Sequence, residues 1–359
     1  MRRLFAFLYK NLLKPVLFLV DPEVIHNHFT SFGEFLGSFA FTNVVTRGIY
    51  GYRGPDISKT VDGITYKTPV LLSAGFDYNA HLPTILQSMG FGGEEVGSVT
   101  LRSCEGNAKP RLTRALKSKS LIVWKGLRND GVDQIIERLR KKQPHIPADF
   151  VVGISIARTN DARTSTEEDG IADYIGSYKK LVAAKTGTYY TINISCPNAF
   201  GGESFAEKSR LTKLLAAITA IRDEKPIYVK LPINPPWEEI RGLLDVCLQY
   251  RVQGVIIGNL NKDYNSLDYR EEAPQEFRGG LSGKPCRELS TALIRQTREY
   301  VGQKFTVIGV GGILTPADAL EKLDAGADLL MLITGMIMEG PHLVSDINYA
   351  IAKRQESAK

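Results

Sequence analysis

The chain contains few cysteines, and their spacing argues against a metal site or a disulfide framework. Cys104, Cys196, Cys247 and Cys286 are far apart in the 359 residues, form no C-x-x-C pair and have no histidine at ligand spacing. Zinc sites and disulfide-stapled folds need clustered ligands, and widely spaced cysteines are typical of a reducing compartment. The sequence therefore predicts no metal ion and a chain without disulfide bonds.

A basic block interleaved with aromatic residues is also missing, although the formal net charge is +6. Nucleic-acid binding needs a clustered basic surface or a recognisable motif, and the excess charge alone supplies neither. We therefore expect no nucleic-acid partner. At this length and 43% hydrophobic residues, one large domain with a small appendage fits as well as two domains.

The N-terminus lacks an unbroken apolar run of the ~20 residues that a membrane-spanning helix needs. Leu and Phe are frequent in residues 1–21 but are interrupted by Lys10 and by Lys14-Pro15, and no small-x-small cleavage site of a signal peptide follows. Asp21-Pro22-Glu23 marks a helix start, and an aromatic-rich pattern continues over residues 24–39. Two short helices of this kind predict an interfacial membrane module over residues 1–45, with membrane contact through residues 1–40. A helical hairpin packed on the main domain is the alternative.

Strand and helix patterns alternate from residue 69 onward, after a hairpin predicted around Asp62-Gly63. Strands are predicted at residues 70–73, 93–96, 151–156, 190–194, 227–231, 254–257, 306–309 and 329–333. Helices are predicted near residues 81–89, 132–141, 171–185, 208–222, 236–250, 287–301 and 316–325, and after Pro341. Eight such units predict an α/β fold, a (β/α)8 TIM barrel, over residues 46–359. A doubly wound sheet is the alternative, but no G-x-G-x-x-G opens an early helix.

Chemically useful residues follow the predicted strands, where a barrel places its active site. Cys196 lies between the carboxamides of Asn193 and Asn198, which could grip a planar amide or imide beside a thiolate. A buried structural cysteine is the alternative. Glycines follow the seventh and eighth strands, as in barrel phosphate sites, and Lys230 on the fifth strand could face the N1–C2 edge of a flavin mononucleotide.

These motifs, in this order, resemble those of the dihydroorotate dehydrogenases, and the layout is similar to their quinone-dependent, membrane-associated class. The resemblance runs from about residue 12 to residue 341 and rests on Asp21-Pro22-Glu23, Ser73-Ala74-Gly75-Phe76-Asp77, Met89-Gly90-Phe91-Gly92, Glu95-Val96-Gly97-Ser98-Val99-Thr100, Gly106-Asn107, Lys109-Pro110-Arg111, Asn193-Ile194-Ser195-Cys196-Pro197-Asn198, Gly280-Leu281-Ser282-Gly283, Ile308-Gly309-Val310-Gly311-Gly312-Ile313 and Gly340-Pro341. It implies FMN in the barrel mouth, and oxidation of dihydroorotate to orotate in pyrimidine biosynthesis. It also implies a quinone acceptor that enters through the N-terminal helices, and a bacterial-type peripheral membrane protein on the cytoplasmic side.

The resemblance also assigns individual residues. Cys196 takes the position of the base that removes a proton while hydride leaves the adjacent carbon for the flavin. Substrate-binding positions are Asn193, Asn198, Asn259 and Tyr78. FMN-binding positions are Ala74, Gly75, Ser98, Ser155, Asn193, Lys230, Gly258, Gly283, Gly312, Ile333 and Thr334.

Several positions depart from the family pattern. Cys196 stands where the quinone-dependent class has serine, and Tyr78 stands where a lysine is expected. At further positions where the family has other polar or aromatic residues, this chain carries Val123, Leu127, Ser155, Ala199, Leu260 and Ile333. A site that leaves a polar ligand group unpaired loses roughly 10⁴-fold in discrimination. The sequence therefore leaves three readings open: a dihydroorotate dehydrogenase in which Lys125 or Arg128 supplies the missing cation, a flavin oxidoreductase for a less polar dihydro-heterocycle, and a non-catalytic membrane-associated homologue.

Overall fold

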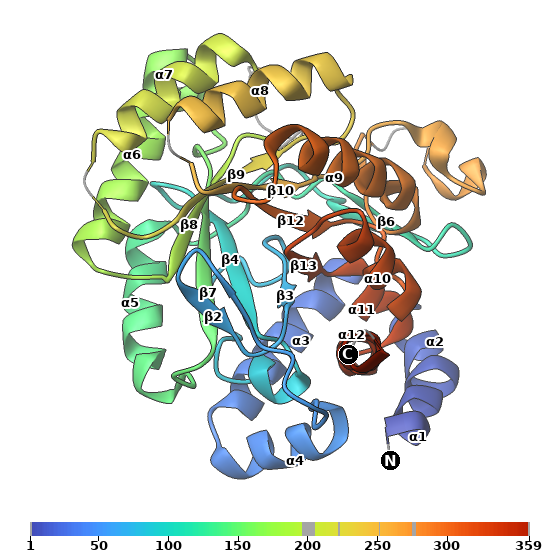
Figure 1. The fold of residues 1–359 in the computed structure, drawn as a ribbon. Coiled ribbons are helices and arrows are strands. Elements are labelled where there is room, and N and C mark those ends of the chain that lie inside the picture. Colours follow the sequence, from blue (N-terminus) through green and yellow to red (C-terminus); the bar gives the residue numbers. More distant parts are fainter. Residues whose placement is uncertain (1, 196–204, 222, 251, 275–277, 358–359) are drawn as a thin grey trace.

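A closed barrel of eight parallel strands forms the body of the molecule (Figure 1). The computed structural model describes residues 2–195, 205–221, 223–250, 252–274 and 278–357. In barrel order the strands are β3 (Val70–Leu72), β4 (Gly93–Val99), β7 (Val151–Ile156), β8 (Tyr189–Asn193), β9 (Ile227–Leu231), β10 (Gly254–Ile257), β12 (Thr306–Val310) and β13 (Leu329–Leu332), and β13 pairs with β3. The predicted TIM barrel is confirmed, and each predicted strand overlaps an observed one.

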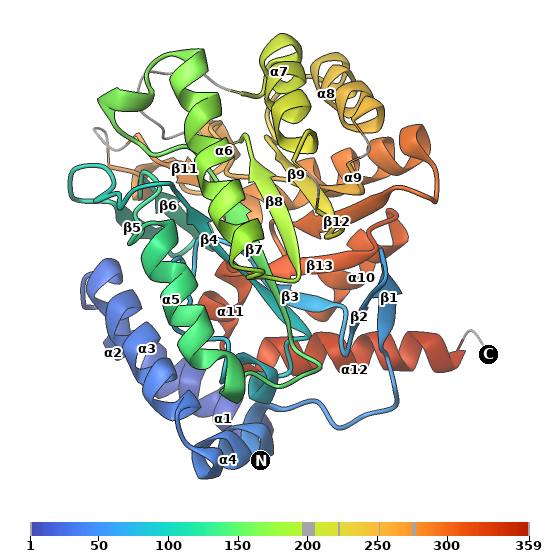
Figure 2. The same ribbon diagram turned by 90° about the vertical axis from the view of Figure 1, so that its left-hand side faces the viewer.

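A ring of helices covers the outside of the barrel (Figure 2) and side chains of the strands fill its interior, so the strands are buried on both faces. The ring consists of α5 (Val132–Lys142), α6 (Glu167–Ala183), α7 (Lys208–Thr219), α8 (Trp237–Gln249), α9 (Arg287–Val301), α10 (Pro316–Asp324), α11 (Thr334–Glu339) and α12 (His342–Ser357). Burial on both faces explains why strands such as β7, with all six residues buried, show continuous rather than alternating hydrophobicity.

The predicted hairpin closes the amino-terminal end of the barrel. Strands β1 (Lys59–Val61) and β2 (Ile64–Tyr66) are joined by Asp62 and Gly63 at φ 49° and 78°. Positive φ at both turn residues is the condition for a tight hairpin turn, and Asp and Gly tolerate it best. The Asp62 carboxylate accepts hydrogen bonds of 2.7 Å from the Tyr228 and Thr306 hydroxyls, which ties the hairpin to β9 and β12.

One predicted helix is wrong. Residues 81–89 form only a 3₁₀ turn, η2 (Leu86–Met89), in place of a helix. Pro83 disfavours helical backbone at the residue before it. The Asp77 carboxylate instead accepts the backbone N–H groups of His81 and Leu82 at 2.9 and 2.6 Å. The chain is therefore held in a turn where the apolar spacing alone indicated a helix.

A small antiparallel sheet at the carboxyl ends of the barrel strands was not predicted. It contains β5 (Leu112–Ala115), β6 (Ser120–Val123) and β11 (Gly280–Leu281). The sheet joins the segment after β4 to the segment after β10, and Val123 pairs with Gly280. Distant parts of the sequence thus form one wall above the barrel mouth.

The N-terminal module has more helix than the sequence indicated. It consists of α1 (Arg2–Leu8), the π-helical turn η1 (Tyr9–Leu13), α2 (Lys14–Leu17), α3 (Pro22–Gly37) and α4 (Ala40–Tyr50). Helix α4 is additional and runs across residue 45, where the sequence places the domain boundary. That boundary remains a prediction.

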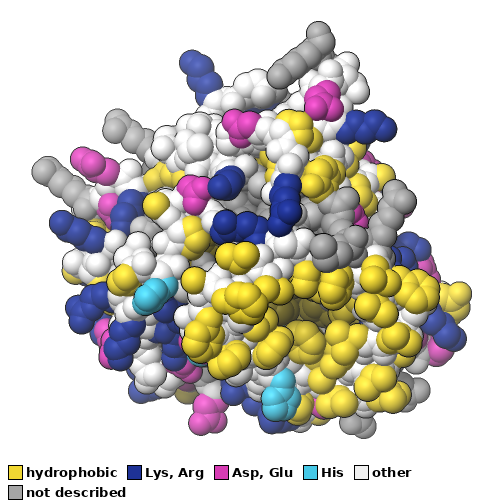
Figure 3. All heavy atoms as spheres, turned by 90° about the horizontal axis from the view of Figure 1, so that it is seen from below, with side chains coloured by type: hydrophobic (Ala, Val, Ile, Leu, Met, Phe, Trp, Pro, Cys, Tyr) yellow, Lys and Arg dark blue, Asp and Glu magenta, His cyan; other side chains and the backbone are white. Residues whose placement is uncertain are grey.

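Helix α3 turns its polar side toward the barrel. Its buried residues are Glu23, Thr30 and Gly37, spaced by seven, whereas Phe32 and Phe35 are each 57% exposed. A globular surface helix normally does the reverse. Seen from below, hydrophobic side chains gather around a hollow (Figure 3). Exposed large apolar residues of the module are Leu4, Phe7, Leu12, Leu13, Val16, Leu19, Val20, Val24, Phe29, Phe32, Phe35, Phe39, Phe41, Val44 and Val45. Within the described ranges, no helix has the length and apolar character needed to cross a membrane.

Candidate active site

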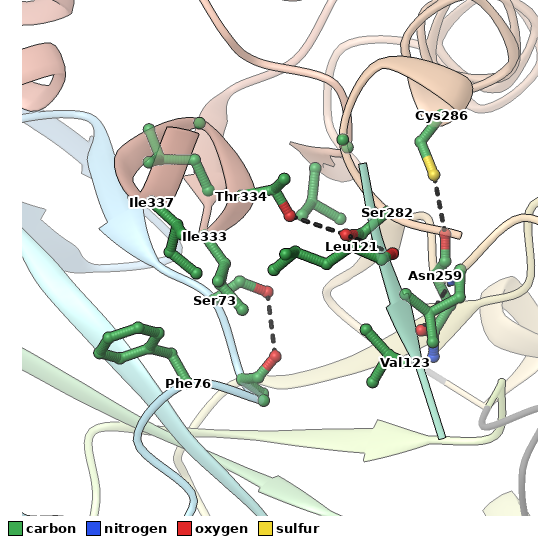
Figure 4. Close-up of a pocket in the computed structure, with 18 of the residues that line it drawn as sticks. Ser73, Phe76, Leu121, Val123, Asn259, Ser282, Cys286, Ile333, Thr334 and Ile337 are labelled. Atoms are coloured by element: carbon green, nitrogen blue, oxygen red, sulfur yellow. Dashed lines mark hydrogen bonds between the residues drawn. The ribbon is translucent and has the colours of Figure 1, made fainter. Parts of the chain in front are cut away.

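One cavity, called the main cavity below, extends from the carboxyl ends of the barrel strands to helix α3. Its empty volume, including the part open to solvent, is about 970 Å³. The lining comes from strand ends, from the small sheet and from α3, which contributes His26. Figure 4 shows Ser73 and Phe76 on one side, with Val123, Asn259 and Ser282 on another. The lining residues are His26, Ser73, Ala74, Gly75, Phe76, Leu112, Leu121, Val123, Lys125, Lys230, Gly258, Asn259, Leu260, Ser282, Gly283, Cys286, Val310, Gly311, Gly312, Ile313, Leu332, Ile333, Thr334, Gly335 and Ile337.

The inner end of the main cavity holds a buried lysine. Lys230 on β9 is 5% exposed, and its amine donates to Ser73 Oγ at 3.3 Å. The Glu95 carboxylate lies 4.0 Å from that amine and accepts the Thr191 hydroxyl at 2.6 Å. Burial raises the pKa of Glu95, whereas the Lys230 amine and the Thr191 hydroxyl act in the opposite direction. The barrel therefore presents a positive group toward the cavity with a carboxyl behind it.

Glycine backbone and two hydroxyl groups form another part of the cavity wall. Gly283, Gly311 and Gly312 have φ of 70°, 105° and 73°, where residues with a side chain are strained. The Ser282 and Thr334 hydroxyls lie 2.8 Å apart, joining the β11 loop to the start of α11. Close backbone approach with hydroxyl donors is the usual composition of a barrel phosphate site.

A chain of hydrogen bonds crosses the barrel mouth through serine and asparagine side chains. The Ser98 hydroxyl lies 2.8 Å from the Ser155 hydroxyl and accepts the Asn193 amide at 2.7 Å. Asn193 Oδ1 accepts the Ser195 hydroxyl at 3.0 Å, and the Asn259 amide donates to the same hydroxyl at 2.8 Å. This series of hydrogen bonds joins β4, β7 and β8 to the loop after β10. Each side chain is thus fixed in orientation by its neighbours.

The main cavity brings together nine of the positions that the sequence assigned to the site. These are Ala74, Gly75, Lys230, Gly258, Asn259, Gly283, Gly312, Ile333 and Thr334. Ser98, Ser155 and Asn193 do not line it but belong to the hydrogen-bond chain that reaches Asn259. Cys196 and Asn198 lie outside the described residues, as does Ala199.

Tyr78 is not part of the main cavity and instead contacts α3. Its ring stacks on His26 at 5.3 Å, and its hydroxyl lies 3.4 Å from Asn27 Oδ1. The Lys125 amine lies over the same ring, 5.4 Å from its centroid. This chain therefore has the Tyr78 ring at the position where the family pattern has a lysine. Lys125, two residues after the end of β6, packs against that ring. Lys125 lines the main cavity, whereas Arg128 does not.

Charged residues cluster where α3 meets the barrel. Glu23, 5% exposed, lies 2.9 Å from Arg128, 3.4 Å from Lys125 and 3.7 Å from Arg111. Burial alone would raise the pKa of Glu23, but the Lys125 and Arg111 charges hold it below its usual value. Burial lowers the pKa of Lys125 to about 8, against the opposing effect of Glu23. One carboxylate thus faces three cations at the cavity wall.

His26, Leu112 and Leu121 are lining residues that the sequence analysis did not identify. His26 follows the buried Glu23 by three positions and precedes the buried Thr30 by four, so all three share one helical stripe. The sequence signal was this polar stripe, which the neighbouring phenylalanines obscured. Leu112 and Leu121 lie on the sheet that was not predicted.

Comparison with known proteins decides the family. A family model described as dihydroorotate dehydrogenase matches residues 56–354. The chain belongs to this family. The dihydroorotate dehydrogenase (quinone) of Synechococcus sp. (strain JA-3-3Ab) is 33% identical, covering 98% of this chain and 94% of the relative. The enzyme of the same description from Christiangramia forsetii is also 33% identical, over 97% and 99%. The crystal structure of Eimeria tenella DHODH in complex with ferulenol superposes with a TM-score of 0.80 at 26% identity, covering 94% of this chain and 92% of that one.

Membership of the dihydroorotate dehydrogenase family implies a flavin cofactor, and the main cavity fits one. A Cβ built on Gly75 would meet only Ile333 Cδ1, at 3.8 Å, so a side chain there would project into the cavity. Lys230 would supply a positive group for negative charge on a flavin ring, and the glycine wall would allow close backbone approach to its phosphate. These residues meet both requirements within one cavity.

The glycine wall gives a test of flavin binding. A Cβ on Gly312 would come within 2.4 Å of Arg287 Cα, so Gly312→Ala must displace the wall. We expect the purified variant to lose most of its flavin absorbance. Gly302→Ala is the matched control: its φ of 71° carries the same left-handed cost of about 1–2 kcal/mol, but nothing lies within 4 Å of the added carbon. Equal flavin content in the two variants would contradict a role for Gly312 in binding.

Proposed function

We propose that this chain is an FMN-dependent, quinone-linked dihydroorotate dehydrogenase, which oxidises dihydroorotate to orotate in pyrimidine biosynthesis. The observation that carries the proposal is the continuity of the main cavity. At one end it contains Lys230 and Asn259, and at the other it reaches His26 of the N-terminal module. A cavity of this form connects a polar site in the barrel mouth, for substrate and flavin, with an approach beside α3 for an apolar acceptor. The relatives described as dihydroorotate dehydrogenase (quinone) support both the substrate and the acceptor in this proposal.

FMN, when bound, accepts hydride from a substrate carbon and passes the electrons to a second substrate. The chain's own residues bind, orient and deprotonate the first one. Cys196, three positions after Asn193 in the sequence, takes the proton from the carbon beside the carbonyl. Asn193, Asn198 and Asn259 hold the ring amides. Asn193 and Asn259 are oriented for this by their shared partner Ser195.

Lys125 is the cation that we propose for the substrate carboxylate. It extends from the same segment as Val123 into the main cavity, beside the position that Tyr78 occupies in place of the family's lysine. The sequence offered Lys125 and Arg128 as candidate cations. Arg128 donates a hydrogen bond of 2.9 Å to Glu23 and does not line the main cavity. In this proposal Lys125 supplies the positive charge that the family's lysine supplies at the position of Tyr78.

A less polar dihydro-heterocycle is the second candidate substrate. The observation that favours it is that Val123 and Leu260, at positions expected to be polar, both line the main cavity. A site with apolar groups there discriminates less strongly for a carboxylated ring. The two substrate classes are separated by the experiments below.

The N-terminal module is proposed to contact the membrane surface peripherally. Its phenylalanines point away from the barrel because the polar stripe of α3 is used for packing. An apolar face of this size, with basic residues such as Lys10 nearby, is typical of helices that lie in the interface. An acceptor dissolved in the bilayer would then enter beside α3.

A first prediction from the proposed function concerns the substrate. The purified protein should be yellow, and anaerobic dihydroorotate should bleach its flavin absorbance. Cys196→Ala should keep the flavin but slow bleaching at neutral pH by at least about 100-fold, since general-base catalysis contributes that much. Cys247→Ala, at a buried position on α8, is the matched control. Bleaching by other reduced ring compounds but not by millimolar dihydroorotate would overturn the substrate assignment, and absence of flavin would indicate the non-catalytic homologue.

A second prediction concerns Lys125. Lys125→Met should raise the dihydroorotate concentration needed for half-maximal bleaching about 10- to 100-fold, the effect of losing a charged hydrogen bond of about 1.5–3 kcal/mol. Arg128→Met, in the same ion cluster but off the cavity, should change it far less. In the parent protein, apparent affinity should fall as pH rises through about 8, where Lys125 loses its proton beside Glu23, Arg111 and Arg128. An unchanged preference for dihydroorotate over dihydrouracil in Lys125→Met would refute the assignment.

A third prediction concerns the membrane. Phe32→Glu combined with Phe35→Glu should lower the partition constant onto lipid vesicles, measured by flotation, by at least about 100-fold, because burial of each large apolar side chain contributes about 1.5–3 kcal/mol. Bleaching by dihydroorotate should remain. Leu248→Glu, an exposed leucine on α8, serves as the control and should float normally. Equal flotation of both variants would show that this face does not contact lipid.

A further inference from the structure

A second, polar cavity meets the main cavity at helix α3. We call it the side pocket; its empty volume, including the open part, is about 630 Å³. Its lining consists of His26, Asn27, Thr30, Ser31, Phe76, Asp77, Tyr78, Asn79, His81, Arg128, Asp130 and Arg138. Asn27 and Ser31 are exposed, so the pocket reaches the protein surface. Polar walls of this kind hold water.

His26 and Phe76 are the two residues that line both cavities. Their rings meet edge to face with centroids 4.9 Å apart, and together they separate the polar pocket from the apolar end of the main cavity. Phe76 can carry no proton. His26 has two ring nitrogens, and no hydrogen-bond partner for either is found among the described residues. The His26 side chain, which lines both cavities, is therefore within reach of molecules in each of them.

The proposed reaction needs a proton at this place. The substrate loses one hydride and one proton, the latter to the base in the barrel mouth and then to solvent. A quinone becomes a quinol by gaining the equivalent of that hydride and one further proton. The proton released at the barrel mouth is thus balanced by one taken up at the quinone end. Leu112, Leu121 and Ile337 line the main cavity and cannot donate one. Lys125 also lines it, but its amine lies 3.4 Å from the Glu23 carboxylate and is held in that ion cluster.

Resting on the proposed function, we propose that His26 relays this proton from water in the side pocket to the quinone oxygen in the main cavity. One imidazole nitrogen donates its proton to the quinone oxygen while the other accepts a proton from water, and the ring stays neutral overall.

The surroundings of His26 favour such a neutral relay. Burial lowers the pKa of His26 to about 3, and the nearby charges of Lys125, Arg128 and His81 act in the same direction. The imidazole is therefore uncharged at ordinary pH, with one nitrogen as donor and the other as acceptor. The Tyr78 ring, stacked at 5.3 Å, holds it from one side and Phe76 from the other. These two aromatic contacts position the ring between the cavities, and no hydrogen bond from the described part of the chain holds it.

The test compares two electron acceptors in His26→Gln. Flavin reduced by dihydroorotate is mixed anaerobically with a short-chain quinone or with ferricyanide, and reoxidation is followed by stopped flow. Ferricyanide takes single electrons and no proton. We expect the limiting rate with quinone to fall about 100-fold, the usual contribution of a positioned proton donor, and the rate with ferricyanide to stay within about twofold. Added imidazole should restore part of the quinone rate.

His28→Gln, an exposed histidine on the same helix, is the matched control and should behave as the parent protein with both acceptors. The relay is overturned if His26→Gln keeps the parent limiting rate with quinone and only its KM rises, because His26 then serves binding alone. Equal slowing with ferricyanide would also overturn it. If dihydroorotate fails to reduce the parent flavin, the proposed function fails, and the relay is tested in the same way after reduction by dithionite.

Discussion

The burial of one carboxylate, Glu23, determines how the N-terminal helices sit on the barrel. Glu23 follows the N-cap Asp21, which accepts its backbone N–H at 2.9 Å and so fixes the first turn of α3. Its side chain is surrounded by Arg111, Lys125 and Arg128. A buried charge is tolerated only when it is paired, and removing one partner of such a pair typically costs 3–5 kcal/mol, so α3 has one favourable rotation about its axis. That rotation directs the polar stripe inward and the phenylalanines outward.

The chemistry of the site follows from the same rotation. His26 lies one turn after Glu23 on the inward stripe, and it therefore contacts the barrel segment that carries Phe76 and Tyr78. On one side of these rings the wall is aliphatic, and on the other it is hydroxyl, amide and charged. The main cavity and the side pocket thus approach the same two residues, His26 and Phe76, one with an apolar wall and the other with a polar wall. A helix with ordinary amphipathicity would bury its phenylalanines here and would leave no polar wall at this point.

The sequence was sufficient for the barrel because burial on both faces leaves strong runs of β-branched residues at regular intervals, as in Val151–Ile156. It was also sufficient for the hairpin at Asp62-Gly63, since positive φ restricts the residues that can occupy such a turn. It failed at residues 81–89, where hydrogen bonds from Asp77 override the apolar spacing. The β5–β6–β11 sheet depends on pairing between residues about 160 positions apart, such as Val123 and Gly280, which local patterns do not encode. For the same reason the direction of Lys125 and the place of His26 could not be read from the chain.

Tyr78 and Lys125 place a positive charge against an aromatic ring at the cavity wall. A cation placed over an aromatic face is attracted by the ring quadrupole, so the Tyr78 ring stabilises the Lys125 amine 5.4 Å from its centroid. The cost is desolvation: the amine is buried beside Arg111 and Arg128, and its pKa falls to about 8. Glu23 offsets part of this cost, and it does so from the N-terminal module. The charge that we propose for the substrate carboxylate therefore depends on the docking of helix α3, which couples the N-terminal module to the main cavity through a single carboxylate.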